Sequence, residues 1–208
     1  MTQTAQPNER EIRSVAAPVE IRREQRAEGD GEQITLVGYA AVYDEETDIG
    51  GWFREVIRPG AFDRALSEGQ DVRALFNHDA NHVLGRSKSG TLRMQSDDKG
   101  LRVEIDLPDT QSARDVVTSI ERGDVDGMSF AFRAVRQSWD ESDPDDLLRE
   151  LLDLDISDAS VVTYPAYEGT SIAKRSLEEA RSKGGTSGRR VNMTRVRRSR
   201  VELERLRY

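Results

Sequence analysis

The sequence has no cysteine, only two histidines and few aromatic residues. The lack of cysteine excludes disulfide bonds and thiolate chemistry, and it weakly favours a reducing compartment. No segment approaches the run of ~20 apolar residues that a membrane-spanning helix needs. The first residues, MTQTAQPNEREIRS, lack the apolar stretch of a secretory signal, so we expect neither secretion nor a membrane partner.

Charged residues make up 34% of the 208 residues and apolar residues 36%, so part of the chain is expected to lie outside any hydrophobic core. The length suits one domain with polar ends. We predict a flexible N-terminus over residues 1–11, one folded domain over residues 12–183 and a basic, disordered tail over residues 184–208. The tail follows a glycine-rich linker and carries eight arginines against two glutamates.

The net charge of −8 argues against general attraction to nucleic acid. Only the basic tail would provide such a contact. Two other roles are open to the tail, which are docking on an acidic partner and proteolytic removal.

The middle of the chain is rich in short apolar–polar alternations, which are typical of β-strands. We predict strands within residues 11–26, 34–43, 52–57, 71–77, 127–135 and 147–163, a hairpin over residues 92–107, and helices near residues 61–66, 110–122 and 171–182. The fold class is therefore mainly β with a few helices (α+β). One closed or nearly closed β-barrel surrounded by short helices would bury this core economically.

The stretch from Gly127 to Phe132, GMSFAF, contains the strongest candidate for chemistry. Strand alternation puts Met128, Phe130 and Phe132 on one face and Ser129 on the other. The simpler interpretation is a serine on a solvent-exposed face. Gly127, however, permits another backbone or a substrate to approach closely. The chain also contains a possible base upstream of Ser129 and a possible acid downstream of it. We predict that Ser129 is the nucleophile of a serine protease.

A serine hydroxyl becomes a good nucleophile only when a base accepts its proton. His78 is the candidate base, because it ends the strand predicted over residues 71–77 and a histidine ordinarily titrates near ~6.5. The alternative is a surface histidine in a polar loop. His78 and His82 also have the i, i+4 spacing of metal ligands beside Asp79, but residues 77–85 predict loop and turn rather than helix. We therefore expect no metal site and no cofactor.

The third candidate is Asp158, which would orient the imidazole. Even-numbered positions 152, 154 and 156 form the apolar face of the last strand, so Asp153 and Asp155 are expected to point outward. Asp158 is also even-numbered, so it is expected on the apolar face unless a bulge shifts the register. A carboxylate on that face must have an ionic or hydrogen-bonding partner. The alternative is a structural carboxylate that caps a turn with Ser157 or Ser160.

Three further groups are candidates for stabilising an oxyanion. They are the backbone amides of residues 127–129 and the side chains of Arg86 and Arg133. For both arginines, the alternative interpretation is a solvent-exposed side chain without a part in catalysis, which is the commoner situation.

These residues fall into blocks whose order and spacing between Ile12 and Ala173 resemble a known family. The blocks are Gly38-Tyr39-Ala40, Glu55-Val56-Ile57 with Pro59-Gly60-Ala61-Phe62, Asn77-His78-Asp79 with Leu84-Gly85-Arg86, Gly127-Met128-Ser129-Phe130, and the run from Asp158 to Ala166. The chain resembles the tailed-phage prohead maturation proteases, which are similar in fold to the herpesvirus assemblins.

The resemblance implies that Ser129 is the nucleophile and His78 the base. Members commonly have Glu where this chain has Asp158, which is shorter by one methylene, and Gly where it has Ala131. Assemblins use a second histidine as the third member, but His82 is very near His78 in sequence, so Asp158 is preferred.

The resemblance also implies a serine endopeptidase that acts in the host cytoplasm, inside the assembling procapsid. Its expected substrates are the scaffold, or the scaffolding arm of the major capsid protein, and the protease itself, and homo-oligomers are considered. Two other classes stay open. One is a catalytically silent module for capsid assembly, and the other is a metal-dependent hydrolase that uses His78, Asp79 and His82.

Overall fold

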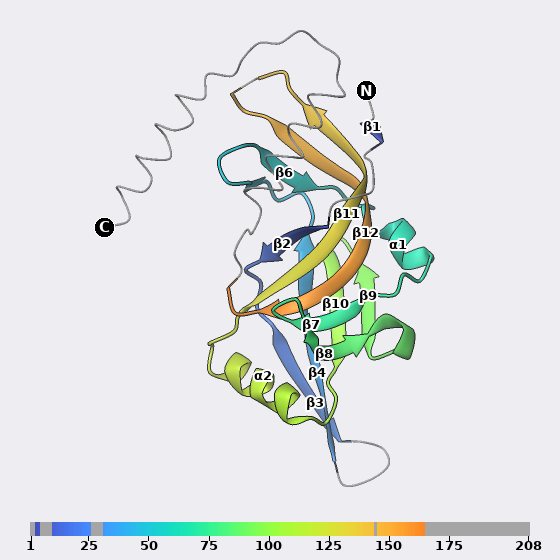
Figure 1. Ribbon diagram of the computed structural model, residues 1–208, viewed down its shortest axis with the longest axis vertical. Coiled ribbons are helices and arrows are strands. Elements are labelled where there is room, and N and C mark those ends of the chain that lie inside the picture. The colour runs from blue at the N-terminus through green and yellow to red at the C-terminus, as the bar shows by residue number, and fades with distance from the viewer. Residues whose placement is uncertain (1–2, 5–9, 26–30, 144, 165–208) are drawn as a thin grey trace, which may run out of the picture.

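The computed structural model describes residues 3–4, 10–25, 31–143 and 145–164 (Figure 1). The helix predicted near residues 171–182, the basic tail and most of the N-terminal segment lie outside these residues. In the part of the chain that is described, no helix has the length and apolar content that a membrane crossing requires.

The described residues form two β-sheets, two α-helices and one 3-10 helix. The eight-stranded sheet contains β1 (Gln3–Thr4), β2 (Glu11–Val15), β5 (Thr47–Asp48), β6 (Arg54–Ile57), β7 (Arg73–Phe76), β8 (Asp79–Arg86), β11 (Gly127–Asp140) and β12 (Leu148–Val162). The four-stranded sheet contains β3 (Glu20–Gln25), β4 (Glu32–Val42), β10 (Gly100–Asp106) and β9 (Leu92–Ser96). The helices are α1 (Asp63–Ser67), η1 (Ser87–Ser89) and α2 (Gln111–Glu121).

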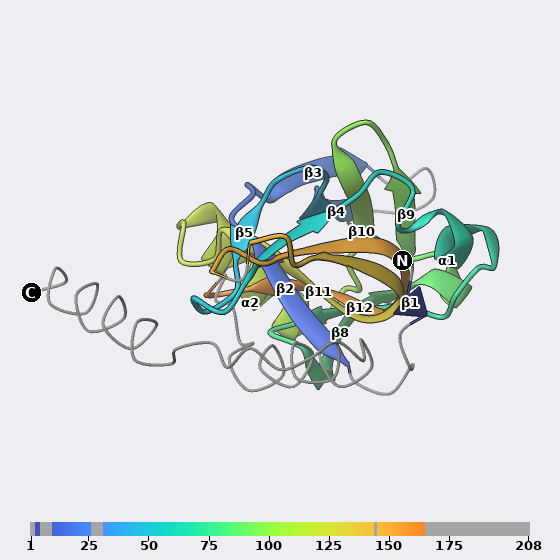
Figure 2. The same ribbon diagram turned by 90° about the horizontal axis from the view of Figure 1, so that it is seen from above.

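The hydrophobic core lies between the two sheets, which Figure 2 shows as layers. Phe130 of β11 stacks on Phe132 at a centroid distance of 5.0 Å and meets Phe62 edge-on at 5.6 Å. A Cβ on Gly38 of β4 would lie 2.5 Å from the sulfur of Met128 on β11. The absence of a side chain at Gly38 therefore lets the two sheets pack together.

The prediction of a mainly β fold with a few helices is confirmed. The prediction of one closed or nearly closed barrel is wrong for the described residues, because their strands pair into two separate sheets. The chain passes from the larger sheet to the smaller one through residues 16–19, between β2 and β3. Local alternation reveals a strand but not its partner, so it cannot distinguish one closed sheet from two packed sheets.

Several local predictions are confirmed. Residues 92–107 contain the β9–β10 hairpin, and Thr110 accepts a hydrogen bond from the amide of Ala113 at the start of α2. Residues 79–86, however, form strand β8 rather than a loop. Much of β8 is exposed, including Val83, so it lacks the apolar alternation by which a half-buried strand is recognised.

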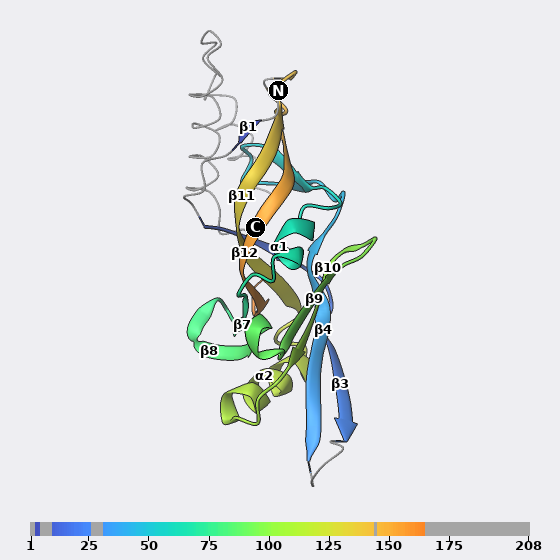
Figure 3. The same ribbon diagram turned by 90° about the vertical axis from the view of Figure 1, so that its right-hand side faces the viewer.

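Strands β11 and β12 make the longest pairing, from Gly127 opposite Val162 to Asp140 opposite Leu148. Figure 3 shows them as a curved pair beside the layer that contains β4 and β10. Strand β2 pairs with β11 on its other edge, and β7 pairs with β12 in parallel. The four strands β2, β11, β12 and β7 thus lie side by side.

A cluster of four buried charges anchors β2. Arg13 donates to Glu55 of β6 at 2.6 and 2.9 Å, and Arg149 of β12 donates to both oxygens of Glu11 at 2.7 Å. All four residues are at most 5% exposed. Burial by itself would raise the pKa of Glu11, but the two arginines more than offset it and lower that pKa to about 2. The ion pairs of this cluster therefore hold β2 against β6 and β12.

We expect Arg149→Met to lower the free energy of unfolding by about 3–5 kcal/mol, because it leaves Glu11 and Glu55 buried with one arginine between them. The matched variant Arg93→Met removes an arginine from a largely exposed pair with Asp106 and should cost less than about 1 kcal/mol. Denaturant unfolding measures both. Equal losses would contradict the assignment of a buried network.

Candidate active site

Ser129 lies on β11 at the point where the strand has a neighbour on each edge. It is directly opposite Ser14 of β2 and Ser160 of β12. Met128, Phe130 and Phe132 belong to the hydrophobic core, and Ser129 lies on the opposite face of the strand, as alternation predicts. That face is not open to solvent, however, because Ser129 has an exposed fraction of 0%.

His78 occupies the two-residue turn between β7 and β8. Asn77 and His78 have positive φ angles of 52° and 56°, as a tight hairpin turn requires of both its central residues. The turn is fixed to the end of β12: the Asn77 amide N–H donates to Val161, and the Asn77 side chain bonds to Thr163 at 2.9 and 3.1 Å. The imidazole is therefore held by the backbone of the turn and by its attachment to β12.

Asp158 reaches the same place because of a bulge in the β11–β12 ladder. Ala131 is opposite Asp158, whereas Phe132 is opposite Ile156, so β12 has one extra residue between these two pairs. Directly paired residues share a face, so Asp158 lies on the face of Ser129, while Ile156 lies on the face of Phe132. Asp158 therefore does not lie on the apolar face, where the unbroken alternation predicted it. The same argument nevertheless selected the residue that contacts His78.

The three predicted residues form a chain of hydrogen bonds. His78 Nδ1 lies 2.5 Å from Asp158 Oδ1, and His78 Nε2 lies 2.6 Å from Ser129 Oγ. The side chain of His78 is 14% exposed and that of Asp158 is 5% exposed. An imidazole that donates through Nδ1 to the carboxylate has Nε2 free to accept the serine proton, which is the arrangement of a nucleophile, base and orienting acid.

Asp158 has two more hydrogen-bonding partners, which the sequence did not predict as parts of the site. Arg10 Nη2 donates to Oδ2 at 2.6 Å, and Ser160 Oγ donates to Oδ1 at 2.9 Å. Burial by itself would raise the pKa of Asp158, but the bonds from His78, Arg10 and Ser160 lower it below its usual value. The sequence identified Ser160 only as a structural partner of Asp158, and nothing local marked the more distant Arg10.

The arginines predicted as oxyanion helpers are placed elsewhere. Arg86 makes a two-pronged contact with Asp71 at 2.7 and 2.6 Å, and Arg133 is exposed, opposite Asp155 on β12. From Met128 to Phe132, β11 is paired with β2 on one edge and with β12 on the other, so the backbone amides of this stretch face those strands. Neither arginine is brought to Ser129.

The metal-ligand pattern is not assembled either. His82 is exposed on β8 and contacts Asp79 at 3.1 Å, whereas His78 faces Ser129 and Asp158. Within the described ranges, no group of three or more His, Asp or Glu side chains is arranged to hold a metal ion.

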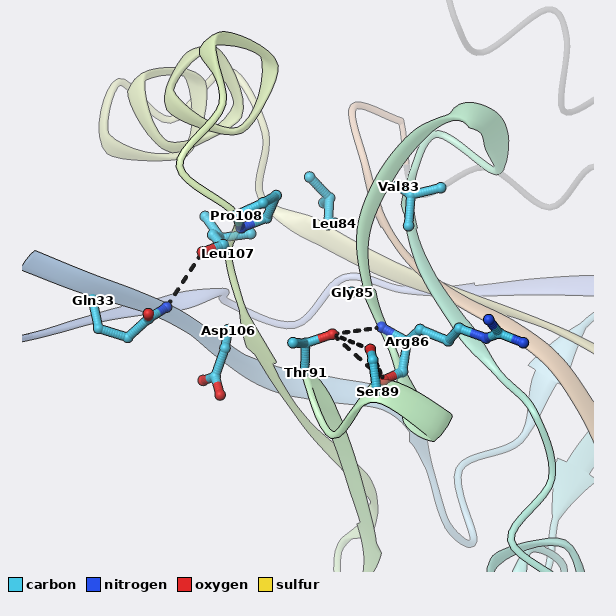
Figure 4. Close-up of a pocket in the computed structure, with 10 residues that line it drawn as sticks. All are labelled: Gln33, Val83, Leu84, Gly85, Arg86, Ser89, Thr91, Asp106, Leu107 and Pro108. Carbon is cyan, nitrogen blue, oxygen red and sulfur yellow. Dashed lines mark hydrogen bonds between the residues drawn. The ribbon is translucent and has the colours of Figure 1, made fainter. Parts of the chain in front are cut away.

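A pocket of about 360 Å³ lies away from these three residues, between β8, η1 and β10 (Figure 4). Thr91 bridges the backbone of Arg86 and the hydroxyl of Ser89 in its floor. The apolar side of the pocket is provided by Leu84 and the exposed Val83. The residues that line this pocket include no nucleophile with an adjacent base, so Ser129 remains the candidate nucleophile.

Comparisons with known proteins agree with the resemblance. Residues 18–183 match the model of the caudovirus prohead serine protease family. Over 148 residues, 70% of this chain, the sequence is 32% identical to the protein named prohead protease of Enterobacteria phage HK97, and it spans 61% of that relative's length. The solved structure of the bacteriophage T4 capsid assembly protease, gp21, has a TM-score of 0.52 at 10% identity, over 74% of this chain and 98% of that one. The last match demonstrates similarity of fold alone.

We expect Asn77→Ala to lower the free energy of unfolding by about 1–3 kcal/mol, because it removes the bonds to Thr163 and leaves a Cβ at a positive φ. The matched variant Asn77→Gly removes the same bonds without the backbone strain, so it should cost less than the alanine variant. Chemical denaturation of both variants measures this difference. An alanine variant as stable as the unmodified chain would rule out this role of the turn.

Proposed function

Because the chain belongs to the caudovirus prohead serine protease family, we propose that it is a serine endopeptidase of capsid maturation. The observation that carries this proposal is the continuous hydrogen-bonded relay from Asp158 through His78 to Ser129. The roles proposed for these residues are acid, base and nucleophile, and the proposed catalytic domain is residues 12–183.

In the proposed reaction, Ser129 Oγ attacks the carbonyl carbon of the scissile peptide bond while His78 Nε2 accepts the hydroxyl proton. Asp158 stabilises the resulting imidazolium and holds the ring orientation. His78 then gives the proton to the leaving amine. Water, deprotonated by the same base, hydrolyses the acyl–serine bond and regenerates Ser129. The sequence of steps uses only this chain's side chains and water.

The proposed substrates are the scaffold or the scaffolding arm of the major capsid protein, and the protease itself. The proposed place of action is the interior of the assembling procapsid in the host cytoplasm. Family membership supports both statements, since the relatives are named for the prohead and for capsid assembly. A homo-oligomer and a contact of the basic tail with nucleic acid are further proposals.

We expect Ser129→Ala to abolish cleavage of co-expressed capsid or scaffold protein, with a loss of about 10⁴-fold or more, because no other group on β11 replaces the hydroxyl. Ser138→Ala, on the same strand but away from His78, is the matched control and should process normally. Gel electrophoresis and mass spectrometry of the products measure this. Unchanged processing by Ser129→Ala in a folded protein would reject the assignment and favour the silent assembly module.

We expect Asp158→Asn to reduce kcat/KM by about 10³–10⁴-fold, because an amide does not hold the productive tautomer of the imidazole. The pKa of Asp158 is lowered in the folded protein, so its support of His78 is present at neutral pH and is lost as the pH falls through that lowered value. The pH dependence of kcat/KM for Asp158→Asn and for Asp153→Asn, a control on the same strand, tests this. Similar losses in both variants would contradict a specific role for Asp158.

A further inference from the structure

A second buried serine lies on the strand next to Ser129. Ser160 of β12 is directly opposite Ser129 of β11, and both residues have an exposed fraction of 0%. Directly paired residues share a face of the sheet, so the hydroxyl of Ser160 lies on the face that carries the relay. At this position β12 pairs with β11 on one edge and with β7 on the other, which fixes the backbone of Ser160 on both sides. The reaction steps proposed above make no use of this hydroxyl.

The hydroxyl of Ser160 contacts two members of the relay. Ser160 Oγ donates to Asp158 Oδ1 at 2.9 Å and lies 3.2 Å from His78 Nδ1. Asp158 Oδ1 is also the oxygen that lies 2.5 Å from His78 Nδ1. The imidazole therefore has Ser129 at Nε2, and at Nδ1 it has both the carboxylate oxygen and the hydroxyl of Ser160.

A hydroxyl has a single proton, so the direction in which Ser160 donates decides which nitrogen of His78 is protonated. While Ser160 donates to Asp158, only the lone pairs of its Oγ face Nδ1, beside the carboxylate oxygen. Nδ1 is then surrounded by acceptors and must carry the ring proton, which leaves Nε2 free to accept from Ser129. If Ser160 donated to Nδ1 instead, the ring proton would lie on Nε2, and the base could not take the proton of Ser129.

The carboxylate of Asp158 is the stronger of the two acceptors that Ser160 can reach. A hydrogen bond to an ionised oxygen is shorter and roughly twice as strong as one between neutral groups, and the distances of 2.9 and 3.2 Å follow that order. Burial by itself would raise the pKa of Asp158, but the bonds from His78, Arg10 and Ser160 lower it overall. The carboxylate is therefore ionised at neutral pH and holds the proton of Ser160.

We propose that Ser160 is a positioning residue that fixes the productive tautomer of His78 through Asp158. This inference rests on the proposed serine-protease function and adds a fourth side chain to the relay. The effect of Ser160 reaches Ser129 through the carboxylate and the imidazole ring, so Ser160 is not itself a catalytic residue.

Ser160 and Arg10 support different oxygens of Asp158. Arg10 donates to Oδ2 from a side chain that is 43% exposed, and such a pair is weakened by water and salt. Ser160 is completely buried and donates to Oδ1, the oxygen that faces the ring. Ser160 also lies within residues 18–183, which match the family model, whereas Arg10 lies before them. The buried hydroxyl therefore sets the orientation of the oxygen that receives the Nδ1 proton.

Labelling of the full chain with a fluorophosphonate probe tests this role. Ser129 Oγ bonds to phosphorus and fluoride leaves, so the maximal labelling rate reports how readily His78 accepts the serine proton, and mass spectrometry locates the label. We expect Ser160→Ala to lower the maximal rate by about 10- to 100-fold, the effect of one hydrogen bond to a charged group. The half-saturating probe concentration should change by less than about twofold. An unchanged maximal rate would overturn the proposal.

Ser160→Cys separates the hydrogen bond from packing. The thiol fills the space of the hydroxyl but is only a weak donor, and the unmodified chain has no cysteine that could confuse the result. We expect its maximal labelling rate to lie within about threefold of that of Ser160→Ala. The matched control Ser138→Ala, on β11 and away from His78, should label at the unmodified rate. Full recovery of the rate in Ser160→Cys would mean that Ser160 only fills space, and the positioning role would be rejected.

A double-mutant cycle with Asp158→Asn distinguishes positioning from a general structural contribution. An amide attracts the Ser160 proton less than a carboxylate does, so the hydroxyl is released to donate to Nδ1 and to favour the unproductive tautomer. In the Asp158→Asn background we expect Ser160→Ala to slow labelling by less than about twofold. Losses that multiply in the double variant would show that Ser160 acts independently of Asp158, which contradicts the proposal.

The failure of the proposed function has a different signature. Ser129 would then stay unlabelled in the unmodified chain and in every variant, co-expressed capsid or scaffold protein would stay uncleaved, and the role of Ser160 would fall as well. When the unmodified chain labels at Ser129 and Ser160→Ala labels at the same maximal rate, the protease assignment stands and only the positioning role is rejected.

Discussion

The ladder between β11 and β12 is the constraint on which the candidate site depends. A regular antiparallel ladder would send Asp158 to the face of Ile156, away from Ser129. The single extra residue on β12 between these two positions reverses the direction of the carboxylate. Because β11 and β12 each pair with a neighbouring strand on both edges around the site, the resulting geometry is held by backbone hydrogen bonds as well as by side-chain packing.

The imidazole is fixed by a different device that ends at the same strand. A hairpin turn with two positive φ angles presents His78, and Asn77 ties this turn to the end of β12. The positions of Ser129, His78 and Asp158 therefore all depend on β12, although the three residues come from separate stretches of sequence. Such a site is preorganised, since no large rearrangement is needed to bring the three groups together.

The segment of residues 10–15 is held against the site by other contacts. It meets the site through one strand, β2, and through Arg10, and its buried charges are balanced within the segment as well as within the rest of the cluster. The hydrogen-bonded relay and strand β2 are held in place by different interactions. A backbone ladder inside the sheet fixes the first, and an edge pairing with paired ions holds the second.

The sequence by itself determined the residue types and most of the strands. The hairpin in residues 92–107, the helix near residues 110–122 and the apolar face of β11 were predictable because each depends on neighbours only a few residues away. Tertiary structure alone decided the pairing of the strands into two sheets, the bulge that turns Asp158, the exposed strand β8 and the contact of Arg10 with a carboxylate 148 residues away. Local periodicity fixes the direction of a side chain only within an unbroken strand. Partners, bulges and long-range ion pairs depend on which strands come together when the chain folds.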